Sequence, residues 1–349
     1  MKLSRRTLIG MSAAAVAAPT LLRMRSAKAA EVTLRLHHFL PPKSTAHPRL
    51  LHPWPKKVGE VSGGKVEIQI FPAMQLGGKP PELYDQAKDG VVDIVWTLPG
   101  YTPGRFPRTE VFELPFIASP RGIVNAKASQ EYAEAHLGEE TKDVKVLAFW
   151  SHDHGVIHCR NKIETLADLQ GQTLRSPTRR AGEALRAAGA AAVGMPVPQV
   201  PESLAQGVLD GAVVPWEVVP AIKLHELVKF HTEIPGTPTF YTATFFIVMN
   251  KAKYEGLPED ARKAIDDTTG MALATEAGNV WDQAGAEVRT MVEGKGNTIL
   301  TLSETDKTAW MKASENVTEA WVAEMKGKNI DAPALMDSAK SLLAKYESA

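Results

Sequence analysis

Apolar residues alternate with polar ones, or run continuously, in short segments that are separated by stretches with helical spacing. Residues 32–36 and 66–70 alternate as half-buried strands do, and residues 46–61 between them have the spacing of an amphipathic helix. A helix is predicted to begin at Pro80, and the apolar run over 91–96 predicts a fully buried strand. Repeated strand, helix and strand units predict an α/β fold with a largely parallel sheet.

The pattern continues through the second half of the chain. Strands are predicted at 144–150, 156–160, 173–176 and 240–250, and helices at 180–188 and 201–206. From Leu257 to about residue 293 the composition is helical, with Glu259 and Asp260 favourably placed in the first turn. A helix of roughly 35 residues would be far longer than the average helix in a globular protein.

The first residues have the features of an export signal. Arg5 and Arg6 precede a weakly hydrophobic run over 8–22, and Ala27-Lys28-Ala29 supplies a cleavage pattern of small residues. We therefore predict a signal peptide over residues 1–30, favouring the twin-arginine route and keeping the general secretory route as the alternative. No later run approaches about 18 apolar residues, so a soluble periplasmic protein is expected.

The remaining length exceeds what one hydrophobic core usually serves, so two lobes are predicted. Lobe I is expected to contain residues 31–151 and about 240–275, and lobe II residues 152–239 and about 276–349. Forty basic and forty acidic residues give a net charge of zero. The sequence therefore has no excess of basic residues of the kind that binds nucleic acid or an anionic membrane surface. The single cysteine, Cys159, excludes an intrachain disulfide bond.

Arg175 is the first candidate for a binding residue. Pro177 ends the strand predicted at Thr173–Ser176, because proline lacks a backbone donor and disfavours helical geometry in its predecessor. An arginine at a strand end is well placed to meet a ligand. Its planar guanidinium matches both oxygens of a carboxylate and remains charged at any working pH, although a structural ion pair is the alternative role.

The stretch from Gly171 to Glu217 resembles the DctP-type solute-binding proteins of TRAP transporters. The motifs that carry the resemblance are Arg175-Ser176-Pro177, Met195-Pro196-Val197-Pro198 and Leu209-Asp210-Gly211, with Gln75-Leu76-Gly77-Gly78, Phe106-Pro107 and Phe112-Glu113-Leu114-Pro115-Phe116 in the family's order upstream. The similarity covers the mature chain from about Val32. It implies a hinged two-lobe fold with a long helix that spans both lobes, an arginine that grips the carboxylate of an organic acid, and a membrane permease as partner.

The same resemblance points to the residues around the arginine. Positions that hold polar groups in sialic-acid-binding members are occupied here by Phe39, Leu98, Tyr101 and Val214, and a second arginine of those members falls near Gly155. Apolar side chains would leave the hydroxyls of a sugar unpaired, at about 1–3 kcal/mol for each buried group. We therefore expect an apolar or aromatic monocarboxylate or a 2-oxo acid, and keep a sugar acid as the alternative.

The resemblance, which implies that the cleft is lined just past the Asp-Gly turn, and the predicted strand ends indicate further ligand-binding candidates. Trp216 and Glu217 come just after the Asp-Gly turn, Trp96 ends its predicted strand, and Pro177 follows Arg175. Each tryptophan could instead be core, since an aromatic face can stack on a ligand or fill a core. Glu217 could instead cap a helix or pair with a basic neighbour.

An enzyme is the strongest competing class. A metal-binding site could be formed by His152, Asp153, His154, His158 and Cys159. Adjacent residues of a strand point to opposite faces, however, and no known metal-binding motif supplies the remaining ligands. Gly-x-Ser-x-Gly, P-loop and dinucleotide motifs are absent from the sequence. We predict no catalytic residue, metal or cofactor, while a cation bridging a 2-oxo acid at Glu217 remains open. A binding protein of another transporter class, or of a sensor, is the third possibility.

Overall fold

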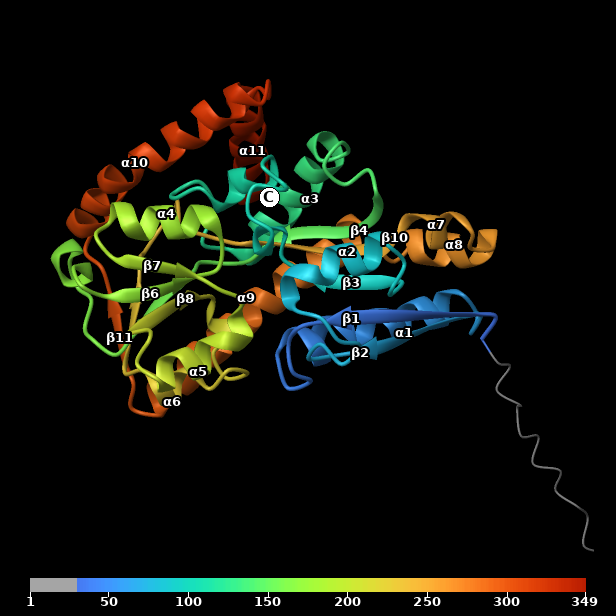
Figure 1. The fold of residues 1–349 in the computed structure, drawn as a ribbon, viewed down its shortest axis with the longest axis horizontal. Coiled ribbons are helices and arrows are strands. Elements are labelled where there is room, and N and C mark those ends of the chain that lie inside the picture. The colour runs from blue at the N-terminus through green and yellow to red at the C-terminus, as the bar shows by residue number, and fades with distance from the viewer. Residues whose placement is uncertain (1–29) are drawn as a thin grey trace, which may run out of the picture.

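The computed structural model describes residues 30–349 and contains two β-sheets that lie side by side, each covered by helices (Figure 1). The predicted export signal over 1–30 lies outside the described residues, apart from Ala30. The first sheet has the strand order β2 (Val66–Phe71), β1 (Val32–His38), β3 (Ile94–Thr97), β10 (Thr244–Asn250) and β4 (Val144–Ser151). The second has the order β11 (Thr298–Thr301), β9 (Phe230–Glu233), β5 (Val156–Cys159), β8 (Gly211–Val214), β6 (Thr173–Ser176) and β7 (Ala191–Gly194). The predicted α/β class is confirmed.

Each sheet is parallel except for one strand. β10 runs antiparallel to both β3 and β4, and β5 runs antiparallel to both β8 and β9. Each of these two strands comes directly after a segment that crosses from one sheet to the other. The chain passes from β4 to β5 through residues 152–155, and it returns from β9 to β10 through residues 234–243. The two crossing segments therefore lie between the sheets.

Helices fill the connections between strands. Their bounds are α1 Pro53–Val61, α2 Leu83–Lys88, α3 Gly122–His136, α4 Arg179–Ala187, α5 Val200–Ala205, α6 Leu224–Leu227, α7 Lys251–Glu255, α8 Glu259–Asp266, α9 Met271–Gly294, α10 Glu304–Gly327 and α11 Ala332–Glu347. Residues 46–61, predicted as one helix, form a single π-helical turn at His47–Leu51 followed by α1. β6 has the bounds that were predicted from the sequence, because Pro177 follows the strand and ends it as expected.

The long helix predicted over 257–293 is divided in two, so the expected length of that helix was wrong. α8 and α9 are separated by a break at which Gly270 has φ +62°, a backbone conformation that a helix excludes. The Gly270 N–H donates instead to the carbonyl of Leu147 at 2.6 Å, which ties the break to β4. α9 still reaches both sheets, because it packs against α3 and β4 of the first and against residues 216–218 of the second (Figure 1).

The last two helices return along the molecule. α10 packs against α4 beside the second sheet, and α11 packs against α3 beside the first. The sequence-based division placed 276–349 with lobe II, and the exact boundaries of the lobes stay a prediction.

An aromatic cluster in the first lobe lies where β3, β4, β10 and α9 meet. Trp96 and Trp150 are nearly parallel, with ring centroids 6.4 Å apart, and Phe245 stacks on both at 5.5 Å. Trp281 of α9 meets the two tryptophan rings edge-on. Rings packed in this way give a rigid floor to the site described below.

Candidate ligand-binding site

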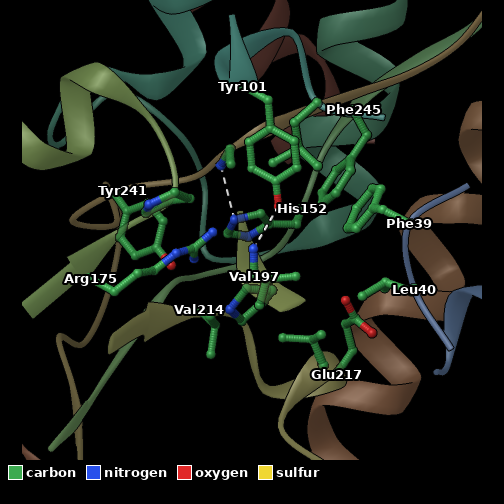
Figure 2. Close-up of a pocket in the computed structure, with 15 residues that line it drawn as sticks. Phe39, Leu40, Tyr101, His152, Arg175, Val197, Val214, Glu217, Tyr241 and Phe245 are labelled. Atoms are coloured by element: carbon green, nitrogen blue, oxygen red, sulfur yellow. Dashed lines mark hydrogen bonds between the residues drawn. The ribbon is translucent and has the colours of Figure 1, made fainter. Parts of the chain in front are cut away.

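A pocket lies between the two sheets, at the carboxyl ends of strands β1, β3, β6 and β8 (Figure 2). The crevice outside the carboxyl ends of parallel strands is the usual ligand site of open α/β sheets. The pocket holds about 360 Å³ of space free of protein atoms, counting its open mouth. It is lined by Phe39, Leu40, Leu98, Tyr101, His152, Arg175, Pro177, Val197, Val214, Pro215, Glu217, Val218, Tyr241, Ala243 and Phe245.

Arg175 is the only lysine or arginine among these lining residues, and its side chain is 1% exposed. Its Nε donates to the carbonyl of Met195 at 2.9 Å, and Nη1 donates to the carbonyl of Val213 at 3.0 Å. Within residues 30–349, no carboxylate forms an ion pair with this guanidinium. Desolvation by burial therefore lowers the pKa of Arg175, and the nearby Tyr101 and Tyr241 offset only part of that effect.

A buried cation without an anionic partner is unusual, because desolvation costs several kcal/mol for each ion unless an opposite charge compensates it. The two carbonyls fix the orientation of the guanidinium and compensate only part of its charge. The geometry therefore presents a fixed cation to the pocket, which suits an anionic ligand.

Two tyrosine hydroxyls belong to the same end of the pocket. The Tyr101 hydroxyl accepts a hydrogen bond from the Val197 N–H at 3.1 Å, so its own proton is free to be donated. The Tyr241 hydroxyl is buried and has no hydrogen-bond partner among the described residues. Both groups can donate to an anion held at Arg175.

His152 contributes an apolar wall and no free polar atom. Its Nδ1–H donates to the Asp153 carbonyl at 2.6 Å, and its Nε2 accepts from the Ala243 N–H at 2.9 Å. Burial lowers the pKa of His152 to about 3, so the ring is neutral at physiological pH. It cannot serve as a second cation in the pocket.

Glu217 lies on the other side of the pocket from Arg175, beside Leu40 (Figure 2). Its side chain is 2% exposed, and Oε2 has no hydrogen-bond partner among the described residues. Burial, and to a lesser degree the nearby Asp153, raise the pKa of Glu217 to about 8. The carboxyl group is therefore neutral at physiological pH, and the ion pair with a basic neighbour that was considered as the alternative role is not formed among the described residues.

The structure brings seven of the nine candidate residues to the pocket: Phe39, Leu98, Tyr101, Arg175, Pro177, Val214 and Glu217. The two tryptophans lie behind its wall. Trp96 stacks on Phe39 at 5.0 Å and belongs to the aromatic cluster, whereas Trp216 donates from Nε1 to Glu233 at 2.9 Å. Both tryptophans are core residues, which was the alternative considered for each.

Sequence reasoning missed the residues supplied by the crossing segments and by the start of β10. His152, Tyr241, Ala243 and Phe245 all line the pocket from these segments. The available signal was topological, since a segment that passes from one sheet to the other must border the space between them.

Gly155 was noted because related proteins carry an arginine near that position. A Cβ atom built on Gly155 would lie 1.9 Å from the Tyr241 ring. No side chain fits there, and the tyrosine ring occupies the space in its place.

The histidines of the alternative metal cluster point to different partners. His158 pairs with His231 at 2.6 Å between their Nδ1 atoms, while His152 is held as described above. Across residues 30–349, no group of three or more His, Cys, Asp and Glu side chains is arranged to hold a metal ion.

Arg179 and Arg180 follow Pro177, but they lie outside the pocket and belong to an ion-pair network. Both contact Glu110 and Glu324, with nitrogen to oxygen distances of 2.5–3.0 Å. Partial burial raises the pKa of Glu324, but hydrogen bonds from the two arginines and from Lys328 outweigh it and lower the pKa to about 2. The network fixes the start of α4 and hence the turn that follows β6, the strand that carries Arg175.

Residues 36–325 match the family model described as bacterial extracellular solute-binding protein, family 7, or DctP. The chain belongs to this family. DctP proteins are the extracytoplasmic binding components of TRAP transporters, and the resemblance to them is confirmed. None of the helices between residues 30 and 349 has the length and hydropathy that a membrane span requires.

Solved TRAP solute-binding proteins resemble this DctP chain over about nine tenths of its length. One from Rhodoferax ferrireducens, in complex with copurified benzoate, is 43% identical with a TM-score of 0.88, over 90% of this chain and 98% of that one. One from a marine metagenome, in complex with 3-hydroxybenzoate, is 44% identical with a TM-score of 0.89, over 91% and 99% of the chains. One from Bordetella bronchiseptica, with bound mandelate, is 27% identical with a TM-score of 0.83, over 90% and 99%. The two-lobe fold is thereby confirmed, and these relatives are transport proteins.

Proposed function

We propose that this DctP protein captures a small aromatic monocarboxylate in the periplasm and delivers it to the permease subunits of a TRAP transporter. The observation that carries the proposal is Arg175, a fixed and buried cation without an anionic partner at the side of an apolar pocket. In this proposal its free edge binds the ligand carboxylate, and the hydroxyls of Tyr101 and Tyr241 donate to the same group.

The walls of the pocket favour a ring over a sugar. Apart from the polar side chains already described, its lining is made of apolar side chains, with Phe39 and Phe245 at one wall. Each hydroxyl of a sugar acid that found no partner there would cost about 1–3 kcal/mol. A flat aromatic body incurs no such cost and gains from contact with the two phenylalanine rings.

The solved relatives support the same ligand class. The two that are 43% and 44% identical to this chain hold benzoate and 3-hydroxybenzoate, and the more distant one holds mandelate. All three ligands are aromatic monocarboxylates. A charge of one on the ligand also matches the single cation of the pocket.

Residues 1–30 would direct export, and the family's extracytoplasmic location agrees with this expectation. We therefore place the mature protein in the periplasm, with the permease of the same transporter as its partner. No catalytic step is proposed, because the relatives bind their ligands for transport.

The test is a binding screen on the mature protein, refolded from guanidinium to remove any copurified ligand. Benzoate, mandelate, 2-oxoisovalerate, glucuronate and succinate would be compared by thermal shift and by calorimetry. A ligand at a hundredfold excess over its Kd stabilises the protein by about 2.7 kcal/mol, enough for a shift of several degrees. A shift with benzoate and none with glucuronate is expected. A response to glucuronate alone would replace the proposed ligand class by the sugar-acid alternative.

A further inference from the structure

The carboxyl group of Glu217 lies apart from the cation that is proposed to hold the anion. Arg175 and the tyrosine hydroxyls lie at one side of the pocket and Glu217 at the other (Figure 2). No ion pair joins Glu217 to Arg175, and no hydrogen bond from another described residue reaches Oε2 of Glu217. An unpartnered polar group that is almost completely buried and faces a cavity calls for a partner from the ligand.

The position of Glu217 is fixed by its own backbone. Glu217 belongs to the helical turn Trp216–Val218, directly after β8, and its carbonyl accepts a hydrogen bond from the Thr45 hydroxyl at 3.0 Å. Thr45 lies between β1 and α1, on the side of the first sheet. The main chain of Glu217 is thus tied to the first sheet by a bond that joins the two lobes.

We infer that Glu217 binds a hydroxyl group on the ring of the aromatic acid, at the end of the ligand that is remote from its carboxylate. The inference rests on the proposed function, since it assumes that Arg175 holds the carboxylate. It names the ligand more closely as a ring-hydroxylated aromatic monocarboxylate.

The charge of the pocket favours a hydroxyl over a second carboxylate. Glu217 keeps its proton at neutral pH because burial and Asp153 raise its pKa. A protonated carboxyl group has one O–H donor and one free acceptor oxygen, and a hydroxyl group has the complementary donor and acceptors. A second carboxylate would be a buried anion for which the pocket has no second cation, because His152 is neutral and Arg175 is already engaged.

The test compares benzoate with 2-, 3- and 4-hydroxybenzoate by calorimetry at pH 7, in the wild type, in Glu217→Leu and in Glu217→Gln. The wild type should bind the 3- or the 4-isomer about tenfold more tightly than benzoate, because a buried donor and acceptor gain partners. The 2-isomer should gain nothing at this site, since its hydroxyl lies beside the carboxylate. Glu217→Leu should reduce the preference, measured as the ratio of the two Kd values within that variant, to threefold or less. Glu217→Gln should retain the preference because an amide also donates and accepts.

Tyr241→Phe is the matched control, because it removes a hydroxyl from the Arg175 side of the pocket. It should weaken benzoate and the hydroxybenzoates by the same factor and leave their ranking unchanged. Isophthalate, with a second carboxylate in place of the hydroxyl, should bind at least tenfold more weakly than 3-hydroxybenzoate.

The outcomes separate this inference from the proposed function. Equal affinities for benzoate and all three isomers, a preference that survives in Glu217→Leu, or tight binding of isophthalate would overturn the role of Glu217 while aromatic acid binding stands. If no aromatic acid binds the wild type, the proposed function itself fails, and the role of Glu217 fails with it.

Discussion

Replacing Arg175 by methionine separates a ligand-binding arginine from a structural one. Methionine fills a similar volume and removes both the charge and the donors. If Arg175 holds the ligand carboxylate, removing one partner of a buried charged pair should cost 2–5 kcal/mol of binding free energy. Because 1.4 kcal/mol corresponds to a tenfold change, the Kd for benzoate should rise by roughly 30-fold to several thousand-fold.

The stability of the variant should change far less than its affinity. Arg175→Met removes the hydrogen bonds that the guanidinium donates to the carbonyls of Met195 and Val213, at a cost of up to about 1–3 kcal/mol each. The same substitution removes a buried cation that no protein carboxylate compensates, which returns several kcal/mol. The two contributions oppose each other, so the ligand-free variant should unfold within about 2 kcal/mol of the wild type.

Calorimetry with benzoate and urea unfolding of the ligand-free proteins measure the two quantities. Arg175→Lys is the control that keeps the charge, and it should recover little affinity because an ammonium group loses the planar, bidentate geometry. Benzoate binding by Arg175→Met within threefold of the wild type would refute the proposed contact. A loss of stability as large as the loss of affinity would show instead that the arginine is structural.

Three further predictions concern the packing and titration of the surroundings. Gly155→Ala should destabilise the protein by about 1–3 kcal/mol in urea unfolding, because its Cβ would overlap the Tyr241 ring, whereas Gly138→Ala, with no atom within 4 Å, should not destabilise it in this way. Between pH 4.5 and 8 the Glu217 carboxyl group is ionised in the unfolded wild type but protonated in the folded protein, so the wild type loses stability as pH rises. Glu217→Gln has no such group, and its stability relative to the wild type should increase by roughly 1.4 kcal/mol per pH unit in this range. Equal pH profiles of the two proteins in urea unfolding would contradict this. The lowered pKa of Glu324 contributes stability that is complete above about pH 4.5 and is lost as pH falls towards 2. Glu324→Gln should therefore lose less stability than the wild type on acidification. Parallel losses in the two proteins would argue against the ion-pair network.

Sequence patterns correctly placed the pocket residues that lie at strand ends. They failed to predict features that depend on tertiary contacts. Phe39, Leu98, Arg175 and Val214 follow or end parallel strands, and the carboxyl ends of such strands converge in any open α/β sheet. The predicted ends of the strands were therefore enough to predict which residues lie near the pocket. The break at Gly270 was missed because a glycine with positive φ leaves no mark on hydrophobic spacing, and the bond to Leu147 that accompanies it is formed only in the folded chain.

The two tryptophans illustrate a different limit. Trp96 and Trp216 each lie within two residues of a strand end, as several pocket residues do, yet neither lines the pocket. Leu98 and Val214, each two positions from one of the tryptophans, do line the pocket, so distance from a strand end does not by itself separate lining residues from core residues. Burial alone could not separate them either, because Arg175 and Glu217 are almost as buried as the tryptophans.

The origin of the lining residues links ligand binding to the relative position of the sheets. Phe39 and Leu98 come from the first sheet, Arg175 and Glu217 from the second, and Tyr241 from a segment that crosses between them. Any change in the angle between the sheets must therefore separate the cation from part of the apolar wall. It must also strain or break the Thr45 hydrogen bond that holds Glu217, which is a direct bond between the two sides. Separation of the lobes would thus weaken the contacts at both ends of an aromatic acid together, and release to a permease would need no chemical change in the ligand.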